Sequence, residues 1–252
     1  MITLKSNREI ELMRIAGNIV YKTHQYLKPF LKPGITTKEI DDLADKYIRS
    51  LDAIPSCKNY QGFPAAICIS INDEVVHGIA GPRKLQDGDI ITLDICACYK
   101  GYHGDSAWSY QIGDVDSEKK HLMEYTEKAL YVGLQEVRPG NRIGDIGYAI
   151  NKFATANGLG VVKELCGHGI GTKLHEDPDV PNYGLKNTGV KLREGMVIAV
   201  EPMLTAKSPT IEILDDDWTV VTKDGSPAAH FEHTVAVTAD GYEILTGEWK
   251  DG

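Results

Sequence analysis

The chain is organised around the stretch Leu165-Cys166-Gly167-His168-Gly169-Ile170-Gly171-Thr172-Lys173-Leu174-His175-Glu176. His168 stands between two glycines, and a second histidine, His175, follows seven residues later. Because glycine has no Cβ, we expect the backbone beside His168 to approach a bound group closely. An imidazole held there can offer a nitrogen to a metal ion or a substrate. Taken alone, the stretch is equally well interpreted as a glycine-rich turn with two surface histidines.

Size and composition exclude several classes of protein. The 252 residues are 42% hydrophobic and 25% charged, which is typical of a soluble globular protein with a sizeable core. The net charge of −9 argues against a protein that coats nucleic acid or an anionic membrane. Residues 1–6 have no apolar run typical of a signal peptide, and no run of about 20 apolar residues predicts a membrane span.

The cysteines indicate a reducing environment. The chain has five of them and no Cys-x-x-Cys motif. An odd number without paired spacing predicts reduced thiols in a cytoplasmic protein, not a disulfide or zinc-finger framework.

Hydrophobic periodicity predicts four helices separated by strands. Ser6 and Glu9 form a capping-box pattern that opens the first helix, which should end before Pro29. The other helices are expected over residues 36–48, 117–137 and 143–156. Apolar, β-branched runs predict strands over residues 67–71, 90–95, 101–110, 196–203, 218–222 and 231–237.

The pattern repeats along the chain. Pro33-Gly34 recurs as Pro139-Gly140 at an offset of 139 − 33 = 106, and five apolar positions of residues 40–48 recur as apolar residues at the same offset. Gly88 precedes Asp94 by six residues, as Gly195 precedes Glu201. We therefore expect one catalytic domain, residues 1–252, made of two related halves, roughly 1–115 and 116–252. Its site should lie in the seam between them.

Four acidic residues lie in or near apolar strands: Asp94, Asp105, Glu201 and Glu232. Burying a carboxylate is costly unless it is paired or bound to a cation. Each one alone is readily explained by a salt bridge or a strand-end cap, with Asp94 and Glu201 ending their strands. Four together with His168 favour a metal site, because two divalent cations would cancel their mutual repulsion. Oxygen donors with one imidazole suit Mn²⁺, Fe²⁺, Co²⁺ or Zn²⁺ and do not choose between them.

Several separated motifs, in this order, resemble one family. They are Val76-His77-Gly78, Asp87-Gly88-Asp89 through Asp94, Gly104-Asp105, Cys166-Gly167-His168-Gly169-Ile170-Gly171, Glu201-Pro202-Met203 and Phe231-Glu232-His233-Thr234. Together they are similar to the type I methionine aminopeptidases, in the short bacterial form. The resemblance implies an α/β (α+β) pita-bread fold: a curved antiparallel sheet covered by two pseudo-symmetric helix pairs.

The resemblance also implies a role for each metal-site residue. Asp94 would bind one metal ion, His168 and Glu201 would bind the other, and Asp105 and Glu232 would bridge the two. Hydroxide activated by the ions would attack the methionyl carbonyl, with Glu201 carrying the proton.

The resemblance also implies a substrate site. His77 and His175 would hydrogen-bond the substrate and stabilise the tetrahedral intermediate. The pocket for the methionine side chain would be lined by Tyr60, Phe63, Cys68, Leu174 and Trp218. For Leu174 or Phe63 alone, plain core packing is the simpler interpretation.

The implied function is removal of the N-terminal methionine from nascent proteins and peptides when the second residue is small. The implied partner is the N-terminal peptide of nascent chains, with the ribosome surface as a candidate. We expect a monomer with no membrane association and no direct nucleic-acid function. Two alternatives are a proline-specific peptidase of the same fold and a metal-free pita-bread protein that binds peptides. The first is disfavoured because such peptidases carry an extra N-terminal domain, and the second because the ligands are present.

One histidine departs from the family pattern. His230 stands two residues before Glu232, where the family is expected to have an uncharged polar residue. On a strand the two side chains would share a face, so His230 could be a partner of Glu232 or a surface residue. We expect a surface residue. His24, His103, His121 and His233 receive no role.

Overall fold

The computed structural model describes residues 2–248, so Met1 and the last four residues of the expected domain lie outside the described part. The four α-helices are α1 (Asn7–Leu27), α2 (Thr37–Ser50), α3 (Ser117–Leu134) and α4 (Ile143–Ala156). Two short 3₁₀ helices, η1 (Lys28–Phe30) and η2 (Tyr60–Gly62), complete the helical segments of this part of the chain.

The strands of the first half are β1 (Ile54–Pro55), β2 (Cys68–Ile71), β3 (Glu74–Val76), β4 (Ile90–Tyr99) and β5 (Tyr102–Gln111). The second half contributes β6 (Gly160–Val161), β7 (Cys166–Gly169), β8 (Glu176–Pro181), β9 (Val197–Val200), β10 (Met203–Thr205), β11 (Ile211–Ile213), β12 (Val220–Thr222), β13 (Ala228–His230), β14 (His233–Val237) and β15 (Tyr242–Ile244). The strand pairings given for these strands are antiparallel.

The predicted helix starts are confirmed by their caps. Ser6 and Glu9 form a reciprocal capping box at the start of α1, and Thr36 and Glu39 form another at the start of α2. The first helix ends at Leu27, before Pro29, because proline cannot supply the next backbone donor. The third helix ends three residues earlier than predicted, at Leu134.

Several strand predictions need correction. The expected strand 196–203 is two strands, β9 and β10, with Glu201 and Pro202 between them, since proline cannot donate to a ladder. The expected strand 231–237 begins only at His233. Asp94 does not end its strand; it lies in the middle of β4, between the two flanking strands β2 and β5.

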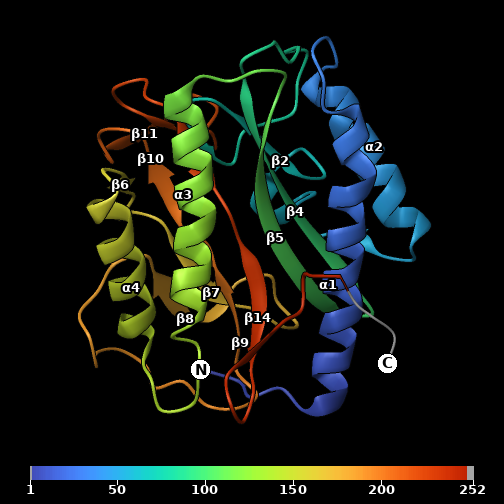
Figure 1. Cartoon of the computed structure of the whole chain (residues 1–252). Helices are drawn as coiled ribbons and strands as arrows, with labels where there is room; N and C mark the ends of the chain where they lie inside the picture. Colours follow the sequence, from blue (N-terminus) through green and yellow to red (C-terminus); the bar gives the residue numbers. More distant parts are fainter. Residues whose placement is uncertain (1, 249–252) are drawn as a thin grey trace.

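The helices form two pairs outside the sheets. In Figure 1, α1 and α2 lie on one side of the molecule and α3 and α4 on the other, with the long strands β4, β5 and β14 between the pairs. Three side chains of α2, Ile40, Ala44 and Ile48, are fully buried, and so are their counterparts in α4, Ile146, Ile150 and Ala154. Each helix therefore faces its core with residues at the offset of 106.

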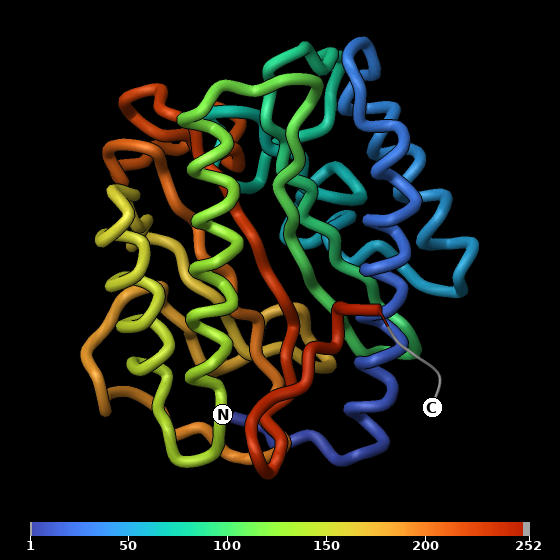
Figure 2. Tube along the Cα trace, in the orientation of Figure 1, coloured from blue at the N-terminus to red at the C-terminus, as the bar shows by residue number. Residues whose placement is uncertain are grey.

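The loops that precede these helices also match. Thr36 forms an isolated antiparallel bridge with Lys84, and Arg142 forms the equivalent bridge with Lys191. The Gly34 amide donates to the Leu85 carbonyl, as the Gly140 amide donates to the Leu192 carbonyl. The tube in Figure 2 shows the same order of a helix, a turn and a second helix twice, once in blue and once in green to yellow.

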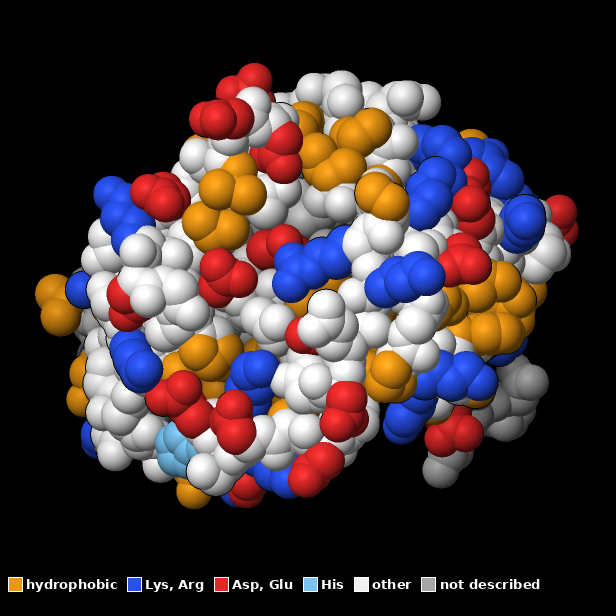
Figure 3. All heavy atoms as spheres, turned by 90° about the horizontal axis from the view of Figure 1, so that it is seen from above, with side chains coloured by type: hydrophobic (Ala, Val, Ile, Leu, Met, Phe, Trp, Pro, Cys, Tyr) orange, Lys and Arg blue, Asp and Glu red, His pale blue; other side chains and the backbone are white. Residues whose placement is uncertain are grey.

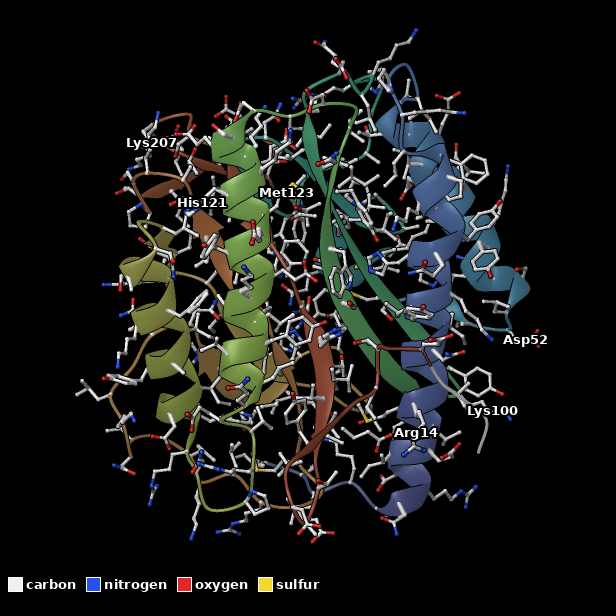
Figure 4. All side chains as sticks on the ribbon, viewed as in Figure 1. Arg14, Asp52, Lys100, His121, Met123 and Lys207 are labelled. Carbon is white, nitrogen blue, oxygen red and sulfur yellow. The ribbon has the colours of Figure 1, made fainter. Side chains whose placement is uncertain are left out.

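The strands of the two halves meet at β5 and β14. The Glu232 amide, just before β14, donates to the Ala107 carbonyl of β5 at 2.8 Å. The Ser106 hydroxyl of β5 donates to the Glu232 carbonyl at 2.7 Å. A contact between α1 and the C-terminal strand adds to this connection, because Arg14 of α1 pairs with Glu243 of β15 at 2.7 Å (Figure 4). The seam therefore consists of backbone and side-chain hydrogen bonds between strands far apart in sequence.

One face of the protein is mixed in charge. On the face seen in Figure 3, acidic and basic side chains are interspersed with apolar ones. Within residues 2–248, no helix is long and apolar enough to cross a membrane.

Candidate metal centre and active site

A cavity of about 330 Å³ opens between the two halves. Its walls include each acid, histidine and pocket residue that the sequence singled out: His77, Asp94, Asp105, His168, His175, Glu201 and Glu232, with Tyr60, Phe63, Cys68, Leu174 and Trp218. The fold thus brings together side chains that are up to 172 positions apart (232 − 60).

The first half supplies two carboxylates from the β4–β5 hairpin. Asp94 and Cys96 are two residues apart on β4 and so share a face, and Asp105 of β5 is the cross-strand partner of Cys96. The Cys96 thiol donates to Asp105 Oδ1 at 2.9 Å. Burial raises the pKa of Asp94 well above its ordinary value and that of Asp105 to about 7, with neighbouring negative groups adding to both effects.

The second half supplies His168 from β7. Its Nε2 lies 3.7 Å from Asp105 Oδ2 and 3.6 Å from Glu201 Oε1. Its Nδ1 lies 2.9 Å from the Gly169 carbonyl, which orients the ring and leaves Nε2 free to bind. Burial lowers the pKa of His168 to about 4, so its imidazole is neutral near pH 7.

The glycines beside His168 act differently from the expectation. A Cβ at Gly167 would collide with the Ala199 carbonyl of β9, and one at Gly169 would collide with the Asp177 carbonyl of β8. These glycines therefore let two neighbouring strands approach β7 closely, instead of clearing space for a bound group.

Glu201 and Glu232 each lie in a short break between two strands. Glu201 follows the last residue of β9, and its carbonyl accepts a hydrogen bond from Asn182 at 2.9 Å. Glu232 lies between β13 and β14 and is only 2% exposed. Burial, with the charge of Asp105, raises the pKa of both carboxyls well above the ordinary range. Glu232 Oε1 has no hydrogen-bond partner among the described residues.

His230 is not a surface residue, which corrects the prediction. It is 1% exposed and lines the same cavity, and two hydrogen bonds join its backbone to the Ser109 hydroxyl of β5. Its Nε2 lies 3.6 Å from Glu201 Oε2 and 3.7 Å from Glu232 Oε2. The sharing of a face with Glu232 was the signal that favoured this position.

The residues expected to face the substrate all line the cavity. His77 has a positive φ of 59°, a sparsely populated conformation for a residue with a side chain. The Tyr60 hydroxyl lies 2.7 Å from His175 Nδ1. Trp218 stacks edge-on against Phe63 at 5.1 Å between ring centroids and approaches His77 at 6.3 Å. The five predicted pocket residues thus form an apolar wall beside the acids.

Two further thiols were missed by the sequence reasoning. The Cys57 thiol donates to Cys96 at 3.3 Å, and both side chains line the cavity with Cys68. Cys96 lies close enough to Asp94 and Asp105 for the three to hold one ion. The spacing of two residues between Asp94 and Cys96, which puts both on one face of a strand, was the signal for Cys96. Nothing in the sequence pointed to Cys57.

The donor set fits divalent metal ions. Three groups of residues could each hold an ion, because the ligand atoms within a group all lie within 4.8 Å of one another. The groups are Asp94, Cys96 and Asp105; Asp105, His168 and Glu232; and Glu201, His230 and Glu232. Asp105 belongs to the first two groups, and Glu232 belongs to the last two. A cation bound among these four carboxyls, whose pKa values are raised by burial, would favour their ionised forms and would give the unpartnered Glu232 oxygen a partner.

Other histidines have ordinary structural surroundings. His24 bonds the Ser106 carbonyl and the Tyr110 hydroxyl, and His233 bonds Thr246 at 2.8 Å. His121 lies on α3, on the side toward α4 in Figure 4, and bonds the carbonyl of Asn157 at the end of α4. His103 contacts the Ser56 hydroxyl at 2.9 Å.

Comparison with known proteins agrees with the site. Residues 11–239 match the model of metallopeptidase family M24. Methionine aminopeptidase 1 of Bacillus subtilis (strain 168) is 52% identical over 246 residues, which cover 98% of this chain and 99% of that protein. A methionine aminopeptidase of Clostridium perfringens is 46% identical over 246 residues, with coverage of 98% and 99%. The chain therefore belongs to metallopeptidase family M24.

Solved structures define the fold. The crystal structure of methionine aminopeptidase from Rickettsia prowazekii superimposes with a TM-score of 0.97 at 42% identity, covering 98% of this chain and 100% of that one. The expected pita-bread α/β fold is confirmed by this likeness. The prolidase from Pyrococcus furiosus shares the fold with a TM-score of 0.77 at 19% identity, and this chain covers 66% of its length.

Proposed function

We propose that this chain is a metal-dependent methionine aminopeptidase, a hydrolase that removes the N-terminal methionine from proteins and peptides. One observation supports this most strongly. Asp94 and Asp105 from one half converge with His168, Glu201 and Glu232 from the other, beside a slot lined by sulfur and aromatic rings. Relatives at 46–52% identity over the whole chain are methionine aminopeptidases, so the proline-specific and metal-free alternatives are not favoured.

The five residues are proposed as the ligands of two divalent ions. Asp94 would hold one ion, His168 and Glu201 would hold the other, and Asp105 and Glu232 would serve both. Ions bound there polarise a carbonyl oxygen and lower the pKa of water. The donor chemistry accepts Mn²⁺, Fe²⁺, Co²⁺ or Zn²⁺. The neutral imidazole of His168 and its contact with the Gly169 carbonyl suit it to ligation near neutral pH.

The remaining side chains orient the substrate and move protons. Glu201, which lines the cavity with its two oxygens each 3.6 Å from a histidine nitrogen, accepts a proton from the attacking water and delivers it to the amine that leaves. His77 and His175, which both line the cavity, hydrogen-bond the methionyl carbonyl and the scissile nitrogen. The Tyr60 hydroxyl holds the His175 ring in place.

The slot fits an unbranched thioether. Phe63, Cys68 and Leu174 are nearly completely buried, and Tyr60 and Trp218 are half-buried at its edge. Sulfur and aromatic contacts favour methionine sulfur. An apolar slot discriminates a missing methylene by only about 1–3 kcal/mol, so norleucine is accepted as well. By family likeness, the second residue of the substrate is small.

The wider setting is proposed on the same basis. The enzyme acts in the cytoplasm as a monomer on the N-terminal peptide of nascent chains, at or near the ribosome surface. It is a single domain of two related halves, which the matching bridges of Thr36 and Arg142 support.

The experiment is cleavage of Met-Ala and Met-Lys peptides by the wild type, His168→Ala and Glu201→Ala proteins. We expect the wild type to release methionine from Met-Ala far faster than from Met-Lys, and both variants to lose activity while they keep the native circular dichroism spectrum. Retained cleavage in either variant would contradict the assigned site. Equal rates on the two peptides would contradict the preference for a small second residue.

A further inference from the structure

His230 presents a buried imidazole whose ring nitrogens form no hydrogen bond among the described residues. It is 1% exposed, and neither ring nitrogen has a hydrogen-bond partner within residues 2–248. A buried polar group without a partner is costly and calls for an explanation. The backbone of His230 is fixed, because its amide donates to the Ser109 hydroxyl and its carbonyl accepts from the same hydroxyl, each at 3.1 Å. The ring is therefore held at the wall of the cavity.

The surroundings of His230 match those of His168. Each Nε2 lies 3.6 Å from one oxygen of Glu201, Oε1 for His168 and Oε2 for His230. Each also lies 3.7 Å from a second carboxylate, Asp105 for His168 and Glu232 for His230. Glu201 thus stands between two imidazoles that approach it in the same way.

We propose that His230 is an additional metal ligand, which binds a divalent ion through Nε2 together with Glu201 and Glu232. The inference rests on the proposed function, since it requires divalent ions in this pocket. Two donors that each lie about 2.1 Å from one ion are at most about 4.2 Å apart, so separations of 3.6 and 3.7 Å allow shared ligation. At those separations, direct hydrogen bonds to the carboxylates are absent.

The contribution of His230 differs from that of His168 in strength. His168 Nδ1 contacts the Gly169 carbonyl, whereas His230 Nδ1 has no such partner among the described residues. Outer partners of this kind typically change metal affinity about 10–100-fold. His230 is therefore the weaker of the two ligands. As a nitrogen donor it favours Co²⁺ and Zn²⁺ over Mn²⁺, which prefers oxygen.

The test measures metal binding directly, with and without the His230 imidazole. The full chain is stripped with chelator and titrated calorimetrically with Co²⁺ and, separately, with Mn²⁺, and the visible spectrum of the Co²⁺ protein is recorded. The variants are His230→Ala and His230→Gln. His233→Gln is the matched control, because His233 is equally buried, three residues away, and bonded to Thr246 instead of facing the cavity.

The proposal predicts that both His230 variants bind Co²⁺ at least about tenfold more weakly, since losing a ligand costs no less than losing an outer partner. They should lose less affinity for Mn²⁺ and change the Co²⁺ spectrum. His233→Gln should match the wild type. If His230→Ala fails to fold, His230→Gln decides. Unchanged affinity and spectrum in the His230 variants of an active enzyme would overturn the ligand role and leave the proposed function intact. A loss of kcat with unchanged Co²⁺ binding would make His230 a positioning residue and also overturn it. A wild type that cleaves no Met-Ala peptide and binds neither ion would overturn both proposals.

Discussion

Asp105 and Thr234 are joined by two hydrogen bonds across the seam between the halves. The Asp105 amide donates to the Thr234 hydroxyl at 3.0 Å, and the same hydroxyl donates to the Asp105 carbonyl at 2.8 Å. Thr234 is fully buried on β14, and Asp105 is a proposed bridging ligand on β5. The bond pair therefore connects the position of the candidate ligand to the assembly of the two sheets.

Replacing Thr234 with valine should destabilise the protein. The substitution keeps the shape of the side chain but leaves the buried amide and carbonyl of Asp105 without partners, at a cost of about 1–3 kcal/mol for each group. Urea unfolding of protein stripped of metal with a chelator measures the change in the free energy of unfolding. Thr155→Val is the control, because Thr155 is exposed on α4 and bonds only the carbonyls of its own helix. An unfolding free energy equal to the wild type in Thr234→Val would show that the seam does not depend on this hydroxyl.

Adding one methyl group at Gly167 should weaken metal binding indirectly, through a shift of the neighbouring strand. Gly167→Ala places a Cβ against the Ala199 carbonyl, so β9 must move and carry Glu201 with it. We expect a loss of unfolding free energy of about 1–3 kcal/mol and weaker Co²⁺ binding, because overpacking forces backbone shifts. Gly241→Ala has nothing within 4 Å of the added atom and should behave like the wild type. Identical Co²⁺ affinity in the two variants would contradict the packing role of Gly167.

The metal-free protein should lose stability as the pH rises from 6.5 to 8. The folded-state pKa of Asp105 is raised to about 7, above its unfolded value of about 3.9. Between these two pKa values the Asp105 carboxyl is protonated in the folded state and ionised in the unfolded state. Its contribution to the free energy of unfolding is therefore lost as the pH rises through 7. Asp94, Glu201 and Glu232 shift in the same direction. His168, with its pKa lowered to about 4, acts oppositely, but only below its unfolded pKa of about 6.5.

Thermal unfolding at several pH values measures this effect. Saturating Mn²⁺ should reduce the decline, since bound cations favour the ionised carboxylates. Asp105→Asn should also reduce the decline in the absence of metal, because one titrating group is gone. The same pH dependence with and without Mn²⁺ would contradict the electrostatic account.

Much of the fold was predictable because its signals are local. Capping residues, helical periodicity and β-branched runs gave the starts of the four helices and most strands, and Ser6 with Glu9 illustrates how directly a cap sets a helix start. Strand ends were less predictable, since pairing with neighbours decides them. Asp94 lies in the middle of β4 because β5 pairs with β4 along its whole length, while β2 ends opposite Asp94 and β1 pairs beyond it.

The convergence of the five candidate ligands followed from family likeness and from the unusual cost of acids in apolar strands. The position of His230 was predicted wrongly although its shared face with Glu232 favoured the cavity, because the burial of that face is not known until the packing of β13 is known. Cys57 was also invisible, since its neighbour Cys96 is set by the pairing of β1 with β4. The glycines beside His168 were noticed for the wrong reason, because a sequence does not show which strand lies next to them.

The central claim is that divalent ions held by these residues are needed to release methionine. The most direct measurement is metal content and Met-Ala cleavage on the same sample, before chelation, after chelation and after addition of Mn²⁺ or Co²⁺. We predict that activity disappears with the bound ions and returns with added metal, to a level that follows the amount bound. Full turnover in a sample shown to contain no metal would contradict the account.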